Sequence, residues 1–124
     1  MCNVTLSLRI APTTDSMHRA FDQLSSWLAT QPLSDSTTFR LRIIAEELMS
    51  NVTRHAAVPA EARVTIGPSS VTFTLIDDGA PFDPTAHPDL GYGLMIANGA
   101  ASHIDYSYTD DHNVTTVTLT SEGD

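Results

Sequence analysis

The stretch AEELMSNVTRHA, residues 45–56, combines the apolar spacing of a helix with three regularly placed polar side chains. Apolar residues at every third or fourth position predict a helix that buries one face, and they are Leu41, Ile44, Leu48 and Val52. Glu47, Asn51 and His55 are four residues apart, so in an α-helix they form a polar row beside that face. Oxygen-bearing side chains at the edge of a core suit a magnesium–phosphate site. On its own, the row is more often a solvated helix face.

A second polar motif, DDGAPFDP at residues 77–84, directly follows a predicted strand. Residues 71–76 alternate between apolar and polar, as in a half-buried strand, and Asp77 stands where that strand ends. The Asp77 carboxylate is suited to accept a hydrogen bond from an exocyclic amine such as that of adenine. Gly79 permits close approach of the backbone. The Asp-Gly pair also marks an ordinary turn, so this motif alone leaves both interpretations open.

A third motif, GYGL at residues 91–94, opens a short predicted helix at about residues 93–101. Glycines at a helix start allow backbone N–H groups to face a phosphate, with the helix dipole in support. A helix cap or a flexible joint explains Gly91 and Gly93 equally well. The three motifs therefore lie on a helix, at a strand end and at a helix start, in that order.

Further strands and helices are predicted around these motifs. They are a strand at 4–10, a helix from about 14 to 31, a helix from about 34 to 57, strands at 64–66, 71–76, 104–108 and 114–119, and a hairpin turn at 110–113. This order indicates an α+β fold, a two-layer sandwich with helices on one face of a mostly antiparallel sheet. The 124 residues, 41% of them hydrophobic, fit a single domain with one core.

The charge balance is strongly acidic, with 15 Asp and Glu against 6 Lys and Arg and a net charge of −9. Binding to a nucleic-acid backbone needs clustered positive charge, so we expect no nucleic-acid partner. An acidic surface suits a basic protein partner, although negative charge also simply keeps a protein soluble. No apolar run approaches the roughly 20 residues that span a bilayer, and the N-terminus lacks a signal-peptide pattern. We therefore expect a cytoplasmic protein that does not contact membranes.

Taken together, the three motifs resemble those of the GHKL superfamily, the Bergerat-type ATPases that include gyrase-type ATPases and sensor histidine kinases. The matching residues are Glu47 and Asn51 for its N box, Asp77, Gly79 and Phe82 to Pro84 for its first glycine box, and Gly91, Gly93 and Leu94 for its second. Within the superfamily, residues 45–56, 77–84 and 113–119 are most similar to anti-sigma regulatory factors of the serine/threonine-protein kinase type. The resemblance covers nearly the whole chain.

The resemblance implies an enzyme that uses ATP and Mg²⁺. Asn51 would hold the Mg²⁺, Glu47 would act as general base on a serine hydroxyl, and Asp77 would read adenine. The other nucleotide-binding residues would be His55, Gly79, Phe82, Gly91, Gly93 and Leu94. The substrate would be an anti-anti-sigma protein of the STAS type, and the other partner would be a sigma factor that is inactive while bound. Members of this group are commonly homodimers.

Three features depart from the pattern of the resembled family. Only residues 85–90 separate Pro84 from Gly91, Tyr92 stands where many relatives carry a basic residue, and Pro81 replaces a common glycine. These departures bear on nucleotide affinity and turnover more than on the fold. They keep open an alternative function, a non-catalytic GHKL binding module or switch protein that regulates a partner by contact. For His55, contact with a phosphate and capping of its own helix are equally open.

Overall fold

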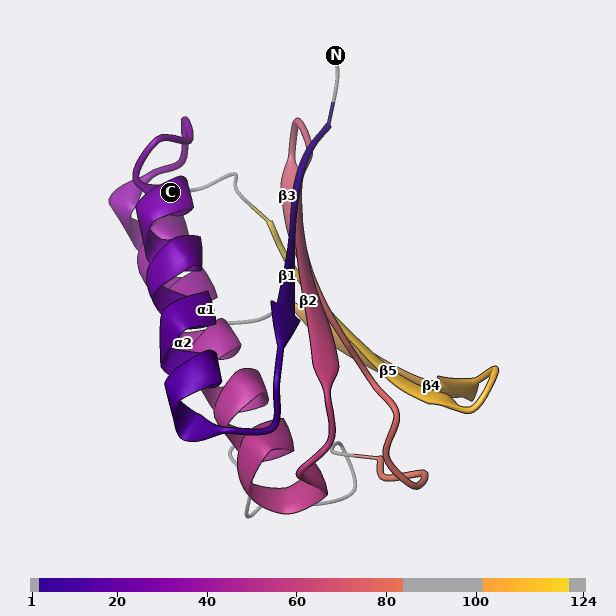
Figure 1. Cartoon of the computed structure of the whole chain (residues 1–124). Helices are drawn as coiled ribbons and strands as arrows, with labels where there is room; N and C mark the ends of the chain where they lie inside the picture. The colour runs from indigo at the N-terminus through magenta and orange to yellow at the C-terminus, as the bar shows by residue number, and fades with distance from the viewer. Residues whose placement is uncertain (1–2, 84–101, 121–124) are drawn as a thin grey trace.

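The computed structural model describes residues 3–83 and 102–120, which form a sheet with two helices on one of its faces (Figure 1). The strands are β1 (Val4–Ile10), β2 (Ala60–Ile66), β3 (Ser70–Asp77), β4 (His103–Thr109) and β5 (His112–Thr120). The helices are α1 (Thr14–Leu28) and α2 (Asp35–Asn51). The predicted α+β sandwich with helices on one face is therefore confirmed.

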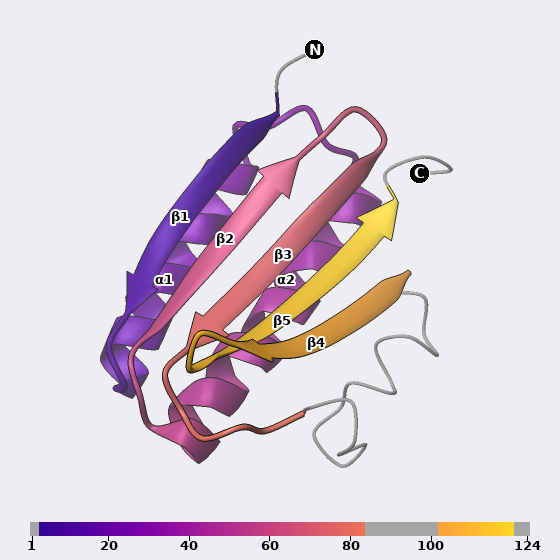
Figure 2. The same ribbon diagram turned by 90° about the vertical axis from the view of Figure 1, so that its right-hand side faces the viewer.

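The sheet has five strands in the order β1-β2-β3-β5-β4, and every neighbouring pair is antiparallel (Figure 2). The hairpin of β4 and β5 joins the sheet beside β3, with β5 on the inside and β4 at the edge. In the register of β3 with β5, Asp77 pairs with Asn113. The end of β3, where the second motif begins, therefore lies beside the start of β5.

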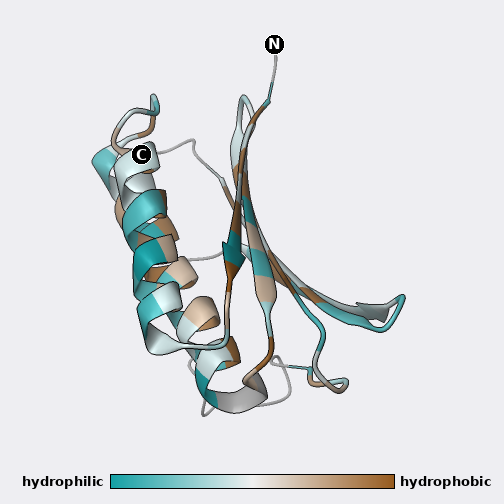
Figure 3. Cartoon of the chain, viewed as in Figure 1, coloured by the Kyte–Doolittle hydropathy of each residue, from teal (hydrophilic) through white to brown (hydrophobic). Residues whose placement is uncertain are grey.

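The core lies between the sheet and the helices, and apolar positions, drawn brown, occur on the ribbons of both layers (Figure 3). Alternate residues of the central strands point into it, and these include Val64, Val71, Phe73, Val117 and Leu119. The predicted apolar face of this helix is buried, because Leu41, Ile44 and Leu48 of α2 are fully buried and Val52, just after α2, is 7% exposed. Burial of this face holds the polar row of α2 at the edge of the core.

Both helices begin where the sequence predicts a start. Thr13 accepts a hydrogen bond from the Ser16 N–H at 3.1 Å, which caps α1. Ser34 accepts a hydrogen bond from the Thr37 N–H at 3.0 Å, which caps α2. A hydroxyl side chain thus satisfies a backbone donor at the first turn of each helix.

The end of the second helix differs from the prediction of one α-helix up to about residue 57. α2 ends at Asn51 and continues as one π-helical turn, η1 (Val52–Ala56). The Ala57 N–H donates to the Val52 carbonyl at 3.0 Å, and Ala57 itself has a left-handed φ of 52°. Pro59 follows and prevents any helical continuation. Asn51 is the last α-helical residue, so the α-helical spacing of the predicted polar row holds for Glu47 and Asn51.

The hairpin turn is shorter than the predicted residues 110–113. Only Asp110 and Asp111 form it, with φ values of 52° and 65°, while His112 and Asn113 already belong to β5. Two-residue turns with positive φ at both positions match the right-handed twist of the flanking strands, and Asp tolerates that conformation. Asn113 therefore lies on β5, on the same face as the buried Thr115 and Val117.

The predicted short helix at residues 93–101 lies outside the described part of the chain, as does the GYGL motif that opens it. Within the residues that are described, neither helix is long and apolar enough to cross a membrane.

Candidate functional site

The C-terminal end of α2, the η1 turn and the loop after β3 lie at the same end of the molecule in both views (Figures 1 and 2). This end carries the first two predicted motifs. The helix contributes Glu47 and Asn51, and the strand end contributes Asp77, Gly79 and Phe82. The fold thus places at one end of the molecule two groups of residues that are about 30 positions apart in the sequence.

Asn51 is the most buried polar residue of the predicted set, with 5% of its surface exposed. Its Oδ1 accepts a hydrogen bond of 2.6 Å from the guanidinium Nη2 of Arg54. The Nε of Arg54 also donates to the Ser50 carbonyl at 3.4 Å. A positive charge therefore stands at the amide oxygen that would hold Mg²⁺ if the family resemblance applies. The site chemistry fits a cation, because a buried amide oxygen and a nearby carboxylate are hard oxygen donors.

Glu47 lies one turn before Asn51 on α2 and is half-buried. Its carboxylate makes no hydrogen bond or ion pair with any described residue. The neighbouring Glu46 is exposed, as expected for a residue about 100° further around an α-helix. A half-buried carboxylate without a partner is available to accept a proton from a bound hydroxyl.

Asp77 is held in place by two hydrogen bonds to the same oxygen. Its Oδ1 accepts from the Gly79 N–H at 2.8 Å and from the Asn113 Nδ2 at 3.0 Å. The bond to Gly79 closes a turn of the Asx type, which bends the chain immediately after the strand. The other carboxylate oxygen, Oδ2, has no hydrogen-bond partner among the described residues. That oxygen is available to accept a hydrogen bond from a ligand amine.

Asn113 ties the residues that directly follow β3 to the sheet, and it is only 4% exposed. Besides Asp77, its Nδ2 donates to the carbonyls of Gly79, at 3.2 Å, and Ala80, at 2.9 Å. Its Oδ1 accepts from the Phe82 N–H at 3.0 Å and from the Tyr106 hydroxyl of β4. One buried amide side chain thus bonds to four residues between Asp77 and Phe82, and it helps to fix the orientation of Asp77.

The sequence prediction missed three residues of this site, namely Arg54, Tyr106 and Asn113. The alternation of residues 104–108 indicates only a strand position for Tyr106, and the turn signal at residues 110–113 includes Asn113. The spacing of Asn113 with Thr115, Val117 and Leu119 was the signal that could have placed it on a buried strand face. Arg54 gave no such signal, because its contact depends on the turn that follows Asn51.

Several predicted residues cannot be placed in this site. Gly91, Gly93 and Leu94 lie outside the described residues, and so does the side chain of His55. Phe82 is described, and 41% of its surface is exposed. Within residues 3–83 and 102–120, no group of three His, Cys, Asp or Glu residues is arranged to hold a metal ion.

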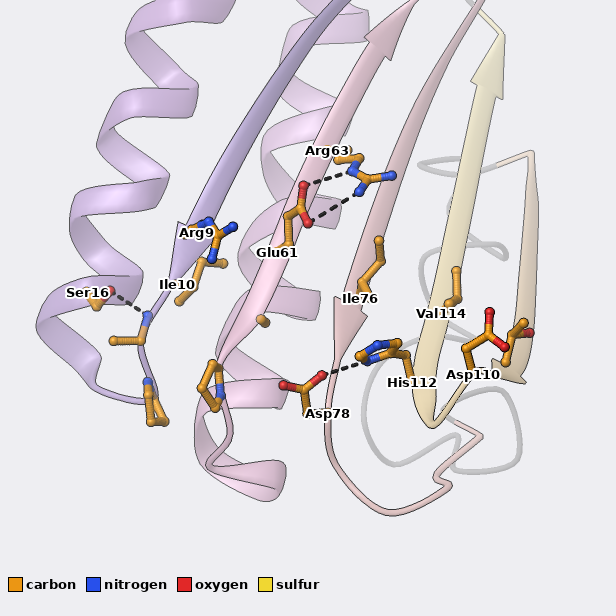
Figure 4. Close-up of a pocket in the computed structure, with 15 residues that line it drawn as sticks. Arg9, Ile10, Ser16, Glu61, Arg63, Ile76, Asp78, Asp110, His112 and Val114 are labelled. Atoms are coloured by element: carbon orange, nitrogen blue, oxygen red, sulfur yellow. Dashed lines mark hydrogen bonds and ion pairs between the residues drawn. The ribbon is translucent and has the colours of Figure 1, made fainter.

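A separate cavity of about 770 Å³ lies beside the ends of β1 and β3 and the start of β2 (Figure 4). Its lining includes Ile76, Val114, Arg9, Asp78 and His112, and none of the predicted nucleotide-binding residues. His112 Nδ1 lies 2.6 Å from Asp78 Oδ1, close enough for an ion pair although the two groups are not aligned as a hydrogen bond. Strand alternation turns Ile76 and Val114 to the face away from the helices, so this cavity is distinct from the candidate site.

Comparison with known proteins assigns the family. Residues 10–120 match the model of the histidine kinase-like ATPase domain. The chain belongs to this family. The match includes α1, α2 and all of the sheet except most of β1, so the candidate site lies within it.

Solved structures support the same fold for this histidine kinase-like ATPase domain. Fourteen chains match, among them one in a crystal structure of the RsbU and RsbW domains of Rv1364c from Mycobacterium tuberculosis. That match has a TM-score of 0.66 and 18% sequence identity over 94% of the present chain. The chain spans only 31% of that larger protein. Comparison with curated protein sequences found no match.

Proposed function

We propose that this histidine kinase-like ATPase domain binds ATP with Mg²⁺ and phosphorylates a serine of an anti-anti-sigma protein. In this proposal the domain holds a sigma factor inactive when the anti-anti-sigma protein is phosphorylated and released. The observation that carries the proposal is the carboxylate of Asp77, which Asn113 and Gly79 fix through one oxygen while the other has no partner. Membership of an ATPase family indicates ATP as the ligand. The fixed carboxylate of Asp77 would recognise its adenine.

The base of the nucleotide would be recognised at Asp77. A carboxylate accepts hydrogen bonds and donates none, so it pairs with the exocyclic amine of adenine and not with the carbonyl oxygen that guanine has at that position. Because the Asn113 network already fixes this carboxylate, little of its freedom would be lost on binding. The loop that carries Gly79 and Phe82 would lie against the same nucleotide.

The phosphates would be held at the end of α2. Asn51 would supply one ligand to Mg²⁺, and the bound ion would neutralise charge on the phosphoryl group during transfer. Glu47, one turn earlier and without a partner, would accept the proton of the attacking serine hydroxyl. We also propose that Gly91, Gly93 and Leu94 bind the nucleotide, and this part of the proposal rests on sequence resemblance alone.

The protein partners follow from the resemblance of residues 45–56 to anti-sigma kinases and from the net charge of −9. A strongly acidic protein associates faster with a basic surface, and salt weakens that attraction. We also propose that the chain forms one domain and acts as a homodimer.

A transfer assay with labelled ATP tests the proposal. Incubated with Mg–ATP and an anti-anti-sigma protein from the same genome, the parent should label the substrate on serine. Glu47→Gln should retain nucleotide binding and lose transfer by about 10²–10⁴-fold, the usual contribution of a general base. The neighbouring Glu46→Gln is the matched control and should keep the parent rate. A transfer rate within about twofold of the parent in Glu47→Gln would exclude Glu47 as the base.

The alternative is a non-catalytic module that binds nucleotide and regulates its partner by contact. The short segment of residues 85–90 and Tyr92 in place of a basic residue favour it. The same assay separates the two functions, because a binding module would give no labelled serine with the parent protein. Partner binding would then survive in both glutamate variants.

A further inference from the structure

The outer face of the sheet, which points away from the helices, carries one apolar spot in otherwise polar surroundings. Strand alternation gives the outward positions of β2, β3 and β5, and threonine is the commonest residue there: Thr65, Thr72, Thr74, Thr116, Thr118 and Thr120. Ile76 and Val114 also point outward, and they are the two aliphatic residues on this face of the described strands. They lie opposite each other in the register of β3 with β5, so their side chains form one apolar pair.

The apolar pair lines the cavity of about 770 Å³ that is separate from the candidate nucleotide site (Figure 4). Strand register places Arg9 beside Glu61 and Glu61 beside Ile76, so a row of side chains crosses four neighbouring strands from Arg9 to Val114. Cavities of roughly 300–1,000 Å³ that combine apolar side chains with a few polar groups are typical of small-molecule sites. This cavity has the size and the composition of such a site.

Positive charge is scarce in this chain, and part of it is gathered at the cavity. The sequence has no lysine and six arginines, of which Arg9 and Arg63 both line the cavity. Arg63 is occupied, because its Nε and Nη2 donate to the two carboxylate oxygens of Glu61 at 2.9 and 3.3 Å. Arg9 makes no hydrogen bond or ion pair with any described residue. Its guanidinium fork is therefore available to a ligand anion, for which the planar pair of donors is suited.

The acidic residues of the cavity restrict which anion can bind. Glu61, Asp78 and Asp110 line it as well. Glu61 is paired with Arg63, and Asp78 Oδ1 lies 2.6 Å from His112 Nδ1, whereas Asp110 has no partner among the described residues. These carboxylates would repel a doubly charged phosphate more strongly than a singly charged carboxylate. Figure 4 shows Asp110 on the other side of the apolar pair from Arg9, so a single negative charge at Arg9 stays away from it.

We propose that this cavity binds a small amphipathic carboxylate, whose charged group pairs with the Arg9 guanidinium and whose apolar body covers Ile76 and Val114. Burial of that body would remove the apolar pair from water, while the charge at Arg9 would give the ligand its orientation. The cavity contains none of the residues proposed to bind nucleotide, so this inference does not depend on the proposed function.

NMR titration of the whole chain with two probes tests the inference. Octanoate and octylammonium share one apolar chain and differ in the sign of their charge. Octanoate should bind the parent saturably, with a Kd of about 1 mM or tighter, and should shift the amide signals of residues that line the cavity. Octylammonium should bind at least about threefold more weakly, because Arg9 repels it.

Three substitutions separate the two parts of the site. Arg9→Gln removes the charge and should weaken octanoate binding at least about threefold, the scale of an exposed ion pair. Val114→Thr gives this position the residue that prevails on the sheet face, and the smaller apolar contact should also weaken binding at least about threefold. Arg19→Gln removes an exposed charge on α1, outside the cavity, and should match the parent.

Several results would overturn the inference. They are no saturable binding of octanoate to the parent, shifts confined to residues outside the cavity, equal affinity for octanoate and octylammonium, or an unchanged affinity in Arg9→Gln. Should a variant fail to fold, the comparison of the two probes on the parent still decides. Failure of the chain to bind ATP would overturn the proposed function and leave this inference standing.

Discussion

Asn113 Nδ2 lies 3.0 Å from Asp77 Oδ1, across a register pair that joins the start of β5 to the end of β3. The contact joins Asp77, which is proposed to recognise adenine, to the buried amide of Asn113, 36 positions later in the chain. Because the same amide also bonds to Gly79, Ala80 and Phe82, the shape of the loop and the orientation of the carboxylate are one structural unit.

Asn113→Ala should therefore lower both stability and nucleotide affinity. The substitution leaves several partly buried donors and acceptors without a partner, so we expect a loss of about 2 kcal/mol in the free energy of unfolding. Chemical denaturation measures it. Tyr106→Phe removes only the hydroxyl that donates to Asn113, and it should cost about 1 kcal/mol or less. Equal stability of Asn113→Ala and the parent would show that the network contributes nothing.

Asp77→Asn should change the preference of the protein for adenine over guanine nucleotides. The variant replaces a pure acceptor with a group that also donates, so ATP affinity should fall about tenfold or more while GTP affinity falls less. Competition binding of ATP and GTP measures the change. Asp78→Asn is the matched control, since Asp78 is exposed, faces His112 and lines the separate cavity. An equal loss of affinity for ATP and GTP would show that Asp77 does not recognise adenine.

The pair of Glu61 and Arg63 on β2 gives a prediction about pH. The Arg63 guanidinium donates to Glu61 at 2.9 Å, and this hydrogen bond lowers the pKa of Glu61 below its ordinary value. Folding then favours the charged carboxylate, so the contribution to stability is present above the ordinary pKa and is lost as pH falls through the folded pKa. The pair is exposed, so the effect on stability should be a few tenths of a kcal/mol at most.

The titration of Glu61 itself is the sharper measurement. In Arg63→Gln, NMR of the Glu61 carboxyl should show a higher pKa than in the parent, because the hydrogen bond and the positive charge that lower it are gone. Arg19→Gln removes an exposed charge on α1 that does not contribute to the lowered pKa of Glu61, and it should leave Glu61 unaltered. A Glu61 pKa that is the same with and without Arg63 would contradict the interaction.

Much of the fold could be predicted from local sequence patterns. The alternation in residues 4–10 and 71–76, the apolar face at Leu41 to Val52, and the capping residues Thr13 and Ser34 each report structure within a few positions of themselves. These patterns predict both helices and all five strands, although β2 begins at Ala60, four residues before the predicted start, and α1 ends at Leu28, before the predicted end near residue 31. The two-layer arrangement then followed from the order of the elements.

The details of the site depend on contacts that local patterns do not encode. The hydrogen bonds of Asn113 exist only because β5 pairs with β3 in one register, which brings together residues far apart in the chain. The contact of Arg54 with Asn51 depends on a π-turn that the helical spacing did not indicate. Sequence motifs therefore named the proposed ligand-binding residues, whereas the residues that orient them emerged from the tertiary structure.

The central claim is that this end of the molecule binds ATP through Mg²⁺ held at Asn51. Calorimetry of ATP binding with magnesium and with a chelator, in the parent and in Asn51→Ala, tests it most directly. The parent should bind ATP at least about tenfold more tightly with magnesium, and Asn51→Ala should lose that gain while remaining folded. If Asn51→Ala binds Mg–ATP as tightly as the parent, with the same magnesium dependence, the metal is held elsewhere and the account is contradicted.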